Sequence, residues 1–150
     1  MNIKKLLGCL LIVVLGITAC QGPMGPPGKD AVMLVRDFNV SSDHWNPAYD
    51  DLMGAFFEYG FSFAELTGTV FDKGAVICYL LQNISYGGRN IVVQTPMPYT
   101  YYGEFQGVLY SENYTFEIRP GYINFIVKVS DFDTQAQQPL DCTFRVVIAR

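Results

Sequence analysis

The only histidine of the chain, His44, stands in the sequence SSDHWNPAYDD beside a serine and an aspartate. These are the residue types of a hydrolase triad, in which the histidine takes the proton from the serine hydroxyl. The members of such a triad come from distant parts of a chain and surround an oxyanion hole, and no nucleophile-elbow motif is present. We therefore expect a polar loop here, with Trp45 packed against the domain.

Carboxylates offer a second kind of chemistry, at Asp50 and Asp51 and again at Asp131 and Asp133. Two carboxyl groups hydrolyse a glycoside only when they face each other across a cleft at a defined separation, which sequence spacing does not predict. Adjacent acids in loops are usually solvated, and only occasionally do they bind calcium. Phosphate loops, dinucleotide fingerprints and metal-ligand spacings are absent from the sequence. We predict no catalytic residue, no metal site and no cofactor.

Sulfur chemistry is limited to four cysteines: Cys9, Cys20, Cys78 and Cys142. A disulfide between Cys78 and Cys142 would stabilise the fold by a few kcal/mol, because it restricts the unfolded chain. The alternative is two buried thiols that pack as small hydrophobic side chains. Two sulfurs and one histidine make a poor zinc site.

Aromatic side chains gather in TPMPYTYYGEF, which contains Tyr99, Tyr101 and Tyr102 among prolines and a glycine. Rings on a firm loop can stack on sugar faces, and the tyrosine hydroxyl adds a hydrogen bond. We consider the Tyr-rich loop 99–105 a candidate glycan-stacking site, with Trp45 as a second platform. The alternative is that these rings close one end of the domain or pack on an edge strand. Fifteen per cent of all residues are aromatic, so such clusters also arise by chance.

The N-terminal segment bears on where these groups are displayed. Lys4 and Lys5 precede an uncharged apolar run at 6–17, which ends in the sequence ITAC at Cys20. The run is too short for a permanent transmembrane helix but suits the core of a signal peptide. An uncleaved anchor and an ordinary signal are the alternatives. An ordinary cleavage site needs a small residue where Ile17 stands.

The ITAC sequence resembles a bacterial lipobox, in which the cysteine is acylated and the chain is cut in front of it. The resemblance implies a signal peptide at 1–19 and a lipidated Cys20 that contacts the bilayer. More than one acyl chain makes such an attachment stable. A spacer at 20–30 and a folded domain at 31–150 complete the expected organisation.

Glycine-led triplets occupy the spacer, GPMGPPGKD at 22–30. A collagen helix needs glycine at every third position over many turns, and here the period stops at Ala31. Three triplets instead favour an extended polyproline-like stalk of roughly 30 Å. Trimerisation through this stretch would require the folded domain to trimerise as well.

Composition narrows the class of protein. Half of the 150 residues are hydrophobic and only 16% are charged. This composition argues against a disordered chain, which has few hydrophobic and many charged residues. The formal net charge of −4 gives no basic patch for nucleic acid. The length suits one domain with a proper core.

From residue 31 onward, apolar residues recur at every second position, as in strands with one face in a core. The clearest runs are 57–63, 114–119, 123–129 and 142–149, with 75–81 apolar on both faces and suited to a central strand; weaker runs are 32–40, 91–95 and 104–110. A short helix is expected from a cap at Thr67 to a left-handed Gly74. We predict an all-β fold, an antiparallel β-sandwich of about seven or eight strands with one short helix. A small β-barrel is the alternative.

Two further motifs are LTGTVFDKGAVICYL at 66–80 and QTPMPYT at 94–100. Together with the lipobox and the triplets they resemble small lipoproteins of gut Bacteroidetes that bear short collagen-like triplets. The matching residues are Leu66, Thr67, Val70, Gly74, Val76 and Tyr79. Met97 replaces the usual leucine, and the group is usually apolar at the position of Cys78. The resemblance implies an outer-membrane address and a β-sandwich, and it implies no functional residue.

Three functions follow as hypotheses. The first is a non-catalytic lipoprotein module that contacts another envelope protein. The second is a glycan-binding module that uses the loop at 99–105, and the third and least favoured is a small hydrolase. The residues after Cys20 leave open whether the domain lies on the cell surface or faces the periplasm.

Overall fold

The computed structural model describes residues 33–130 and 138–150. Residues Ala31–Arg150 form one compact unit, and every described residue of the buried core cluster belongs to this unit. The unit therefore has what it needs to fold by itself. The signal peptide, Cys20 and the spacer lie outside the described residues, as do Asp131 and Asp133.

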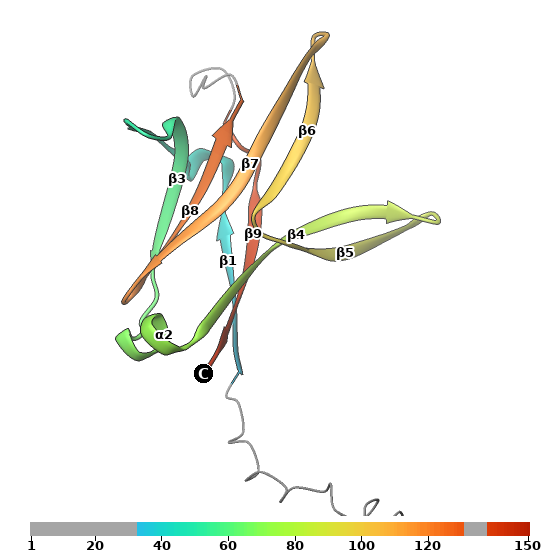
Figure 1. Ribbon diagram of the computed structural model, residues 1–150. Coiled ribbons are helices and arrows are strands. Elements are labelled where there is room, and N and C mark those ends of the chain that lie inside the picture. The colour runs from blue at the N-terminus through green and yellow to red at the C-terminus, as the bar shows by residue number, and fades with distance from the viewer. Residues whose placement is uncertain (1–32, 131–137) are drawn as a thin grey trace, which may run out of the picture. The chain divides into compact units, whose positions relative to one another are not determined.

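The described residues form an all-β sandwich of two antiparallel sheets, as predicted (Figure 1). The strands are β1 (Met33–Val40), β2 (Asn46–Asp50), β3 (Gly54–Ser62), β4 (Ala75–Tyr86), β5 (Arg89–Pro96), β6 (Tyr99–Phe105), β7 (Val108–Arg119), β8 (Tyr122–Val129) and β9 (Cys142–Ala149). One sheet has the order β1-β9-β4-β5 and the other β2-β3-β8-β7-β6. The sheets stay separate, so the barrel alternative is wrong.

The core lies between the sheets and follows the predicted alternation. On β9, Cys142, Phe144, Val146 and Ile148 are buried, and the residues between them are partly exposed. Phe144 stacks on Phe125 of the opposite sheet, with ring centroids 4.1 Å apart and planes within 9°. Burial of such rings supplies most of the driving force for closing the two sheets on each other.

The predicted helix is present as α2 (Gly68–Lys73), and a single turn, η1 (Ser42–His44), precedes β2. The side chain of Thr67 caps α2 by accepting a hydrogen bond from the Val70 amide at 3.3 Å, as expected. The prediction of a left-handed Gly74 was wrong, because its φ is −89°. Glycine is needed there for space instead: a Cβ would lie 2.8 Å from the Val70 carbonyl oxygen and 3.1 Å from that of Ala149.

Two segments expected to be loops are strands. Part of the expected polar loop forms β2, an edge strand in which Pro47 is tolerated because one side of the strand needs no hydrogen-bond partner. The expected loop 99–105 is β6, which pairs with β7 along its whole length. Conversely, the weak strand expected at 104–110 is interrupted by a hairpin turn at Gln106 and Gly107, both with positive φ.

Strand β4 changes partner along its length. It pairs with β9 over residues 75–81 and with β5 over residues 79–86, so both partners flank it only at 79–81. Beyond that overlap, β4 and β5 continue as a two-stranded hairpin that projects from the sandwich (Figure 1).

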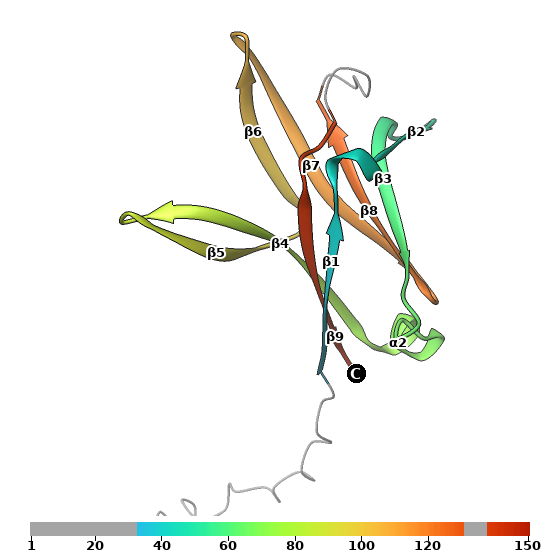
Figure 2. The ribbon, with the colours of Figure 1, turned by 180° about the vertical axis from the view of Figure 1, so that it is seen from behind.

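Strand β7 changes partner in the same way in the other sheet. It pairs with β6 over residues 108–114 and with β8 over 112–119. The β6–β7 hairpin therefore also projects, and the tips of the two hairpins lie apart from each other in both views (Figure 1, Figure 2).

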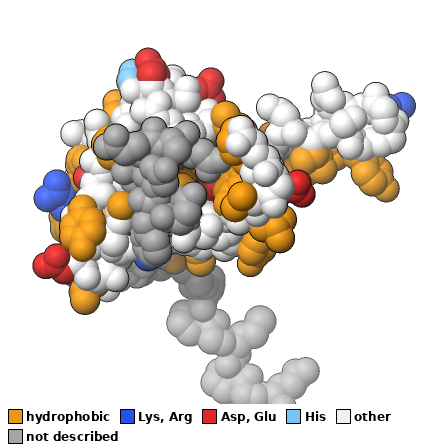
Figure 3. All heavy atoms as spheres, turned by 90° about the horizontal axis from the view of Figure 1, so that it is seen from above, with side chains coloured by type: hydrophobic (Ala, Val, Ile, Leu, Met, Phe, Trp, Pro, Cys, Tyr) orange, Lys and Arg blue, Asp and Glu red, His pale blue; other side chains and the backbone are white. Residues whose placement is uncertain are grey.

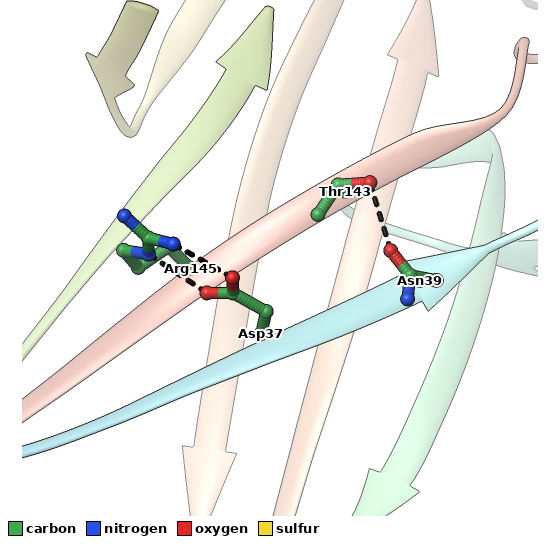
Figure 4. A network of polar contacts seen from close by, with 4 residues as sticks. All are labelled: Asp37, Asn39, Thr143 and Arg145. Atoms are coloured by element: carbon green, nitrogen blue, oxygen red, sulfur yellow. Dashed lines mark hydrogen bonds and ion pairs between the residues drawn. The ribbon is translucent and has the colours of Figure 1, made fainter. Parts of the chain in front are cut away.

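Polar contacts fasten the edge strand β1 to β9 (Figure 4). Arg145 donates two hydrogen bonds to the Asp37 carboxylate at 2.8 and 2.7 Å, and the Thr143 hydroxyl donates to Asn39 at 2.8 Å. The hydrogen bonds from Arg145 lower the pKa of Asp37 below its ordinary value of 3.8. Folding is therefore favoured by the ionised carboxylate.

We predict that Asp37→Asn lowers the free energy of unfolding modestly, because an exposed pair contributes little. The pair is fully formed above pH 3.8, and its contribution is lost as the pH falls through the lower folded-state pKa. The difference between wild type and Asp37→Asn, measured by urea unfolding, should therefore shrink below pH 3.8. Asn39→Ala removes a neutral contact on the same strand and should give a difference that does not vary with pH. A constant difference for Asp37→Asn would contradict this explanation.

Candidate functional site

A cavity of about 630 Å³ opens at the bases of the two projecting hairpins. Its walls come from β4, β6, β7 and the segment before β9. Four of the lining residues are tyrosines: Tyr99, Tyr101, Tyr110 and Tyr114. We call this hollow the tyrosine cavity.

Strand alternation and register place the four rings. Tyr99 and Tyr101 are two residues apart on β6 and so lie on one face of the strand. Tyr99 pairs directly with Tyr114, and their ring centroids are 6.2 Å apart with planes at 33°. Tyr101 and Tyr110 have centroids 6.3 Å apart and planes at 63°. The rings thus form angled walls rather than a flat platform.

Gly103 makes this arrangement of rings possible. It pairs with Tyr110 across the hairpin. A Cβ at position 103 would lie 2.6 Å from the Tyr110 ring and 2.8 Å from the Tyr101 ring. Any other residue here would push both rings out of their places, so the absence of a side chain holds part of the cavity in shape.

The cavity is acidic. Glu112 and Asp141 line it, and the described lining contains no lysine, arginine or histidine. The Tyr114 hydroxyl donates to Oε2 of Glu112 at 2.5 Å, and Oδ1 of Asp141 accepts the Ser42 amide at 2.8 Å. Each bond fixes one oxygen of its carboxylate against the wall.

Burial and these carboxylates raise the pKa values of three neighbouring groups. Burial, and then the hydrogen bond to Glu112, raise the pKa of Tyr114. Burial first and the negative charge of Glu112 second raise the pKa of Tyr110. Burial, followed by the charges of Glu112 and Asp141, raises the pKa of Cys142 to about 12. The raised pKa values keep the Tyr110 and Tyr114 hydroxyls and the Cys142 thiol neutral at physiological pH.

Of the side chains considered for glycan stacking, only Tyr99 and Tyr101 line the cavity. Tyr102 points to the opposite face of β6 and is 78% exposed. The prediction of Trp45 as a stacking platform is wrong, because only 2% of this residue is exposed. Its ring packs edge-on against Phe144, and its indole N–H donates to the Leu140 carbonyl. The alternative, that this ring packs against the domain, is confirmed.

Sequence reasoning missed the other half of the cavity. Tyr110, Glu112 and Tyr114 come from β7, and the pairing of β6 with β7 brings them beside Tyr99 and Tyr101. The only signal in the sequence was their own alternation, because 110, 112 and 114 share one face of a strand. Nothing in the sequence indicated that this face would line a cavity.

Of the two alternatives for Cys78 and Cys142, the structure shows the pair of buried thiols, because both cysteines are free and no disulfide joins them. The register explains this. Cys78 on β4 pairs with Val146 on the neighbouring β9, four residues along the strand from Cys142. Four residues of extended strand separate the two Cα atoms by about 13 Å, well beyond the reach of a disulfide.

The other candidates have structural roles. The His44 ring stacks on Tyr59, with centroids 5.6 Å apart, and Oδ1 of Asp50 accepts the amides of Leu52 and Met53 in a turn. In residues 33–130 and 138–150, no three His, Cys, Asp or Glu side chains gather as metal ligands. Within the same residues, no helix is long and apolar enough to cross a membrane.

A second hollow, of about 410 Å³, lies on the outer face of the five-stranded sheet. Four of its side chains are engaged with one another. Asn124 donates to Glu58 at 2.7 Å, and the Arg119 guanidinium lies 4.4 Å from the centre of the Tyr122 ring. The tyrosine cavity is the better candidate for a ligand.

Comparisons with protein families, with curated proteins and with solved structures found no match to this chain. The site is therefore interpreted from its own geometry and charge.

We predict that both cysteines of the unit Ala31–Arg150 are unreactive in the folded protein. Burial raises the pKa of Cys78 and of Cys142 to about 12, so almost no thiolate is present at pH 8. A thiol reagent such as dithiobis(nitrobenzoate) should label neither residue before unfolding. In guanidinium without a reductant it should label both. Two missing thiols in guanidinium would instead show a disulfide.

Proposed function

We propose that this chain is an outer-membrane lipoprotein of a Gram-negative bacterium whose β-sandwich binds a small ligand in the tyrosine cavity without converting it. The lipobox-like ITAC sequence supports the anchor, because acylation of Cys20 would attach the mature chain to the bilayer by its first residue. The binding role rests on the cavity.

The observation that carries the binding role is the combination of size, rings and polar groups in one hollow. A volume of about 630 Å³ is in the range of small-molecule sites. Such sites are mostly apolar, with a few polar groups that orient the ligand. Four tyrosines with Gln82, Asn83 and two carboxylates fit that description. Gly103 leaves room for this ring arrangement, because a Cβ there would meet the Tyr110 and Tyr101 rings.

A sugar is one class of ligand that such a lining suits. Tyrosine rings pack against the apolar faces of sugars, and the amides and carboxylates can bond to hydroxyl groups. The glycan hypothesis now concerns a cavity formed by β4, β6 and β7 and no longer a loop at 99–105.

The fixed orientation of the two carboxylates supports binding without catalysis. Glu112 is held by the Tyr114 hydroxyl and Asp141 by the Ser42 amide, so each has a fixed orientation. A side chain held in one orientation by a hydrogen bond suits the recognition of a ligand.

Contact with another envelope protein is a second candidate function, and the projecting hairpins favour it. Exposed hydrophobic side chains lie on the β4–β5 hairpin (Ile84, Tyr86, Ile91, Val92) and at the tip of the β6–β7 hairpin (Phe105, Val108, Leu109). Figure 3 shows hydrophobic side chains along the arm that extends to the right, the β4–β5 hairpin. Exposed apolar surface of this kind commonly marks contact sites.

We predict that Cys20 carries the lipid. Cells that express the full chain and are fed an alkyne-labelled fatty acid should incorporate the label, and mass spectrometry should find Cys20 as the first residue. Cys20→Ala should lose the label and leave the membrane fraction. Cys78→Ala, which removes a buried thiol, should keep the label. Labelling of Cys20→Ala, or retention of residues 1–19 in the wild type, would contradict the anchor.

We predict that ligands of the unit Ala31–Arg150 bind through Tyr101 and not through its neighbour Tyr102. Thermal unfolding would be followed with a panel of neutral oligosaccharides and small alkylammonium salts, because a ligand of the folded state raises the Tm. Tyr101→Ala should weaken binding of any stabilising compound about tenfold through the loss of a ring contact. Tyr102→Ala removes an equal ring from the opposite face and should leave binding unchanged. Equal losses in the two variants, or a panel without any stabilising compound, would count against the cavity.

A further inference from the structure

We infer that the ligand of the tyrosine cavity is a small organic cation, held by its alkylammonium group between the tyrosine rings and the Glu112 carboxylate. This inference rests on the proposed function and adds the chemical class of the ligand.

Charge is the first argument. Glu112 and Asp141 both line the cavity, and its described lining contains no basic side chain that could balance them. Their field reaches other groups of the wall, because it adds to burial in raising the pKa of Tyr110 and of Cys142. An occupant thus meets a negative potential.

The rings are the second argument. Aromatic faces attract a cation that lies within about 6 Å of the ring centre, and several tyrosines around one site form the cages that bind quaternary ammonium groups. Tyr101 and Tyr110 meet at 63° and so form two walls of a corner. Glu112 pairs directly with Tyr101 across the hairpin, which places a carboxylate at this corner. The chain already uses the same interaction elsewhere, where Arg119 lies over the Tyr122 ring.

Desolvation decides between a cation and a neutral sugar. A ligand that fills the cavity removes water from both carboxylates, and an ionised group without an opposite charge is costly to bury. A neutral sugar would compensate this only with hydrogen bonds. An ammonium group compensates it with charge, while its alkyl substituents contact the rings.

The experiment compares two probes of the same shape. Choline carries a trimethylammonium group, and 3,3-dimethylbutan-1-ol is its uncharged carbon analogue. Isothermal titration of the unit Ala31–Arg150 with each probe should show choline binding at least about tenfold more tightly. Because both titrations use the wild-type protein, this comparison does not depend on the folding of a variant. Affinity for choline should fall as salt concentration rises.

Variants then locate the interaction. Glu112→Gln keeps an oxygen that can accept the Tyr114 hydroxyl but removes the charge, and it should weaken choline binding about tenfold. Glu117→Gln makes the same change on the same strand, where the side chain lines the outer hollow, and it should have no effect. Gly103→Ala should also weaken binding by displacing the two rings, whereas Gly68→Ala adds a methyl group in open space and should not.

The possible outcomes separate the two proposals. Equal or tighter binding of the uncharged analogue would overturn the cationic ligand. So would choline binding that survives Glu112→Gln. Binding of neutral oligosaccharides without binding of choline would overturn this inference and leave the proposed function standing. Absence of binding by every probe would overturn both.

Discussion

The architecture depends on a change of partner in the middle of two strands. Strand β4 passes from β9 to β5, and β7 passes from β6 to β8, with overlaps of only three residues, 79–81 and 112–114. A strand that loses its neighbour on one side can leave the sandwich, and both do so with a hairpin partner (Figure 2). The tyrosine cavity lies at these overlaps, since Leu80, Leu81, Glu112 and Tyr114 all line it. The cavity is thus a product of strand register and not of an inserted loop.

Glycines opposite or near tyrosines shape both faces of the five-stranded sheet. Tyr110 covers Gly103 on the cavity side, and the Tyr122 ring lies over Gly60 on the outer side, where a Cβ would meet its hydroxyl oxygen at 1.8 Å. A ring that covers a glycine restores the packing that the missing side chain does not provide. On the cavity side the same arrangement has a further effect, because it fixes the angle between two rings of the lining.

The sequence was sufficient for the sandwich and much of its core, because period-two alternation on segments such as 123–129 and 142–149 states which face is buried. It was insufficient where a local signal competed with pairing. The prolines and the glycine in TPMPYTYYGEF favoured a loop. The segment is nevertheless strand β6, because it is rich in tyrosine, a strong strand former, and pairs with β7. For Trp45 and for the pair of Cys78 and Cys142 the sequence left two alternatives open, and it could not decide between them because burial and register are properties of the whole fold. The cavity could not be predicted, since alternation identifies a face but not whether another sheet covers it.

The position of the single tryptophan makes its intrinsic fluorescence a reporter of the cavity. The buried Trp45 donates its indole N–H to the carbonyl oxygen of Leu140 at 3.3 Å, and Leu140 is itself part of the cavity wall. Indole emission responds to the hydrogen bonding and polarity around its nitrogen. An occupant that displaces Leu140 would therefore change the colour or yield of the fluorescence, with no dye attached to the chain.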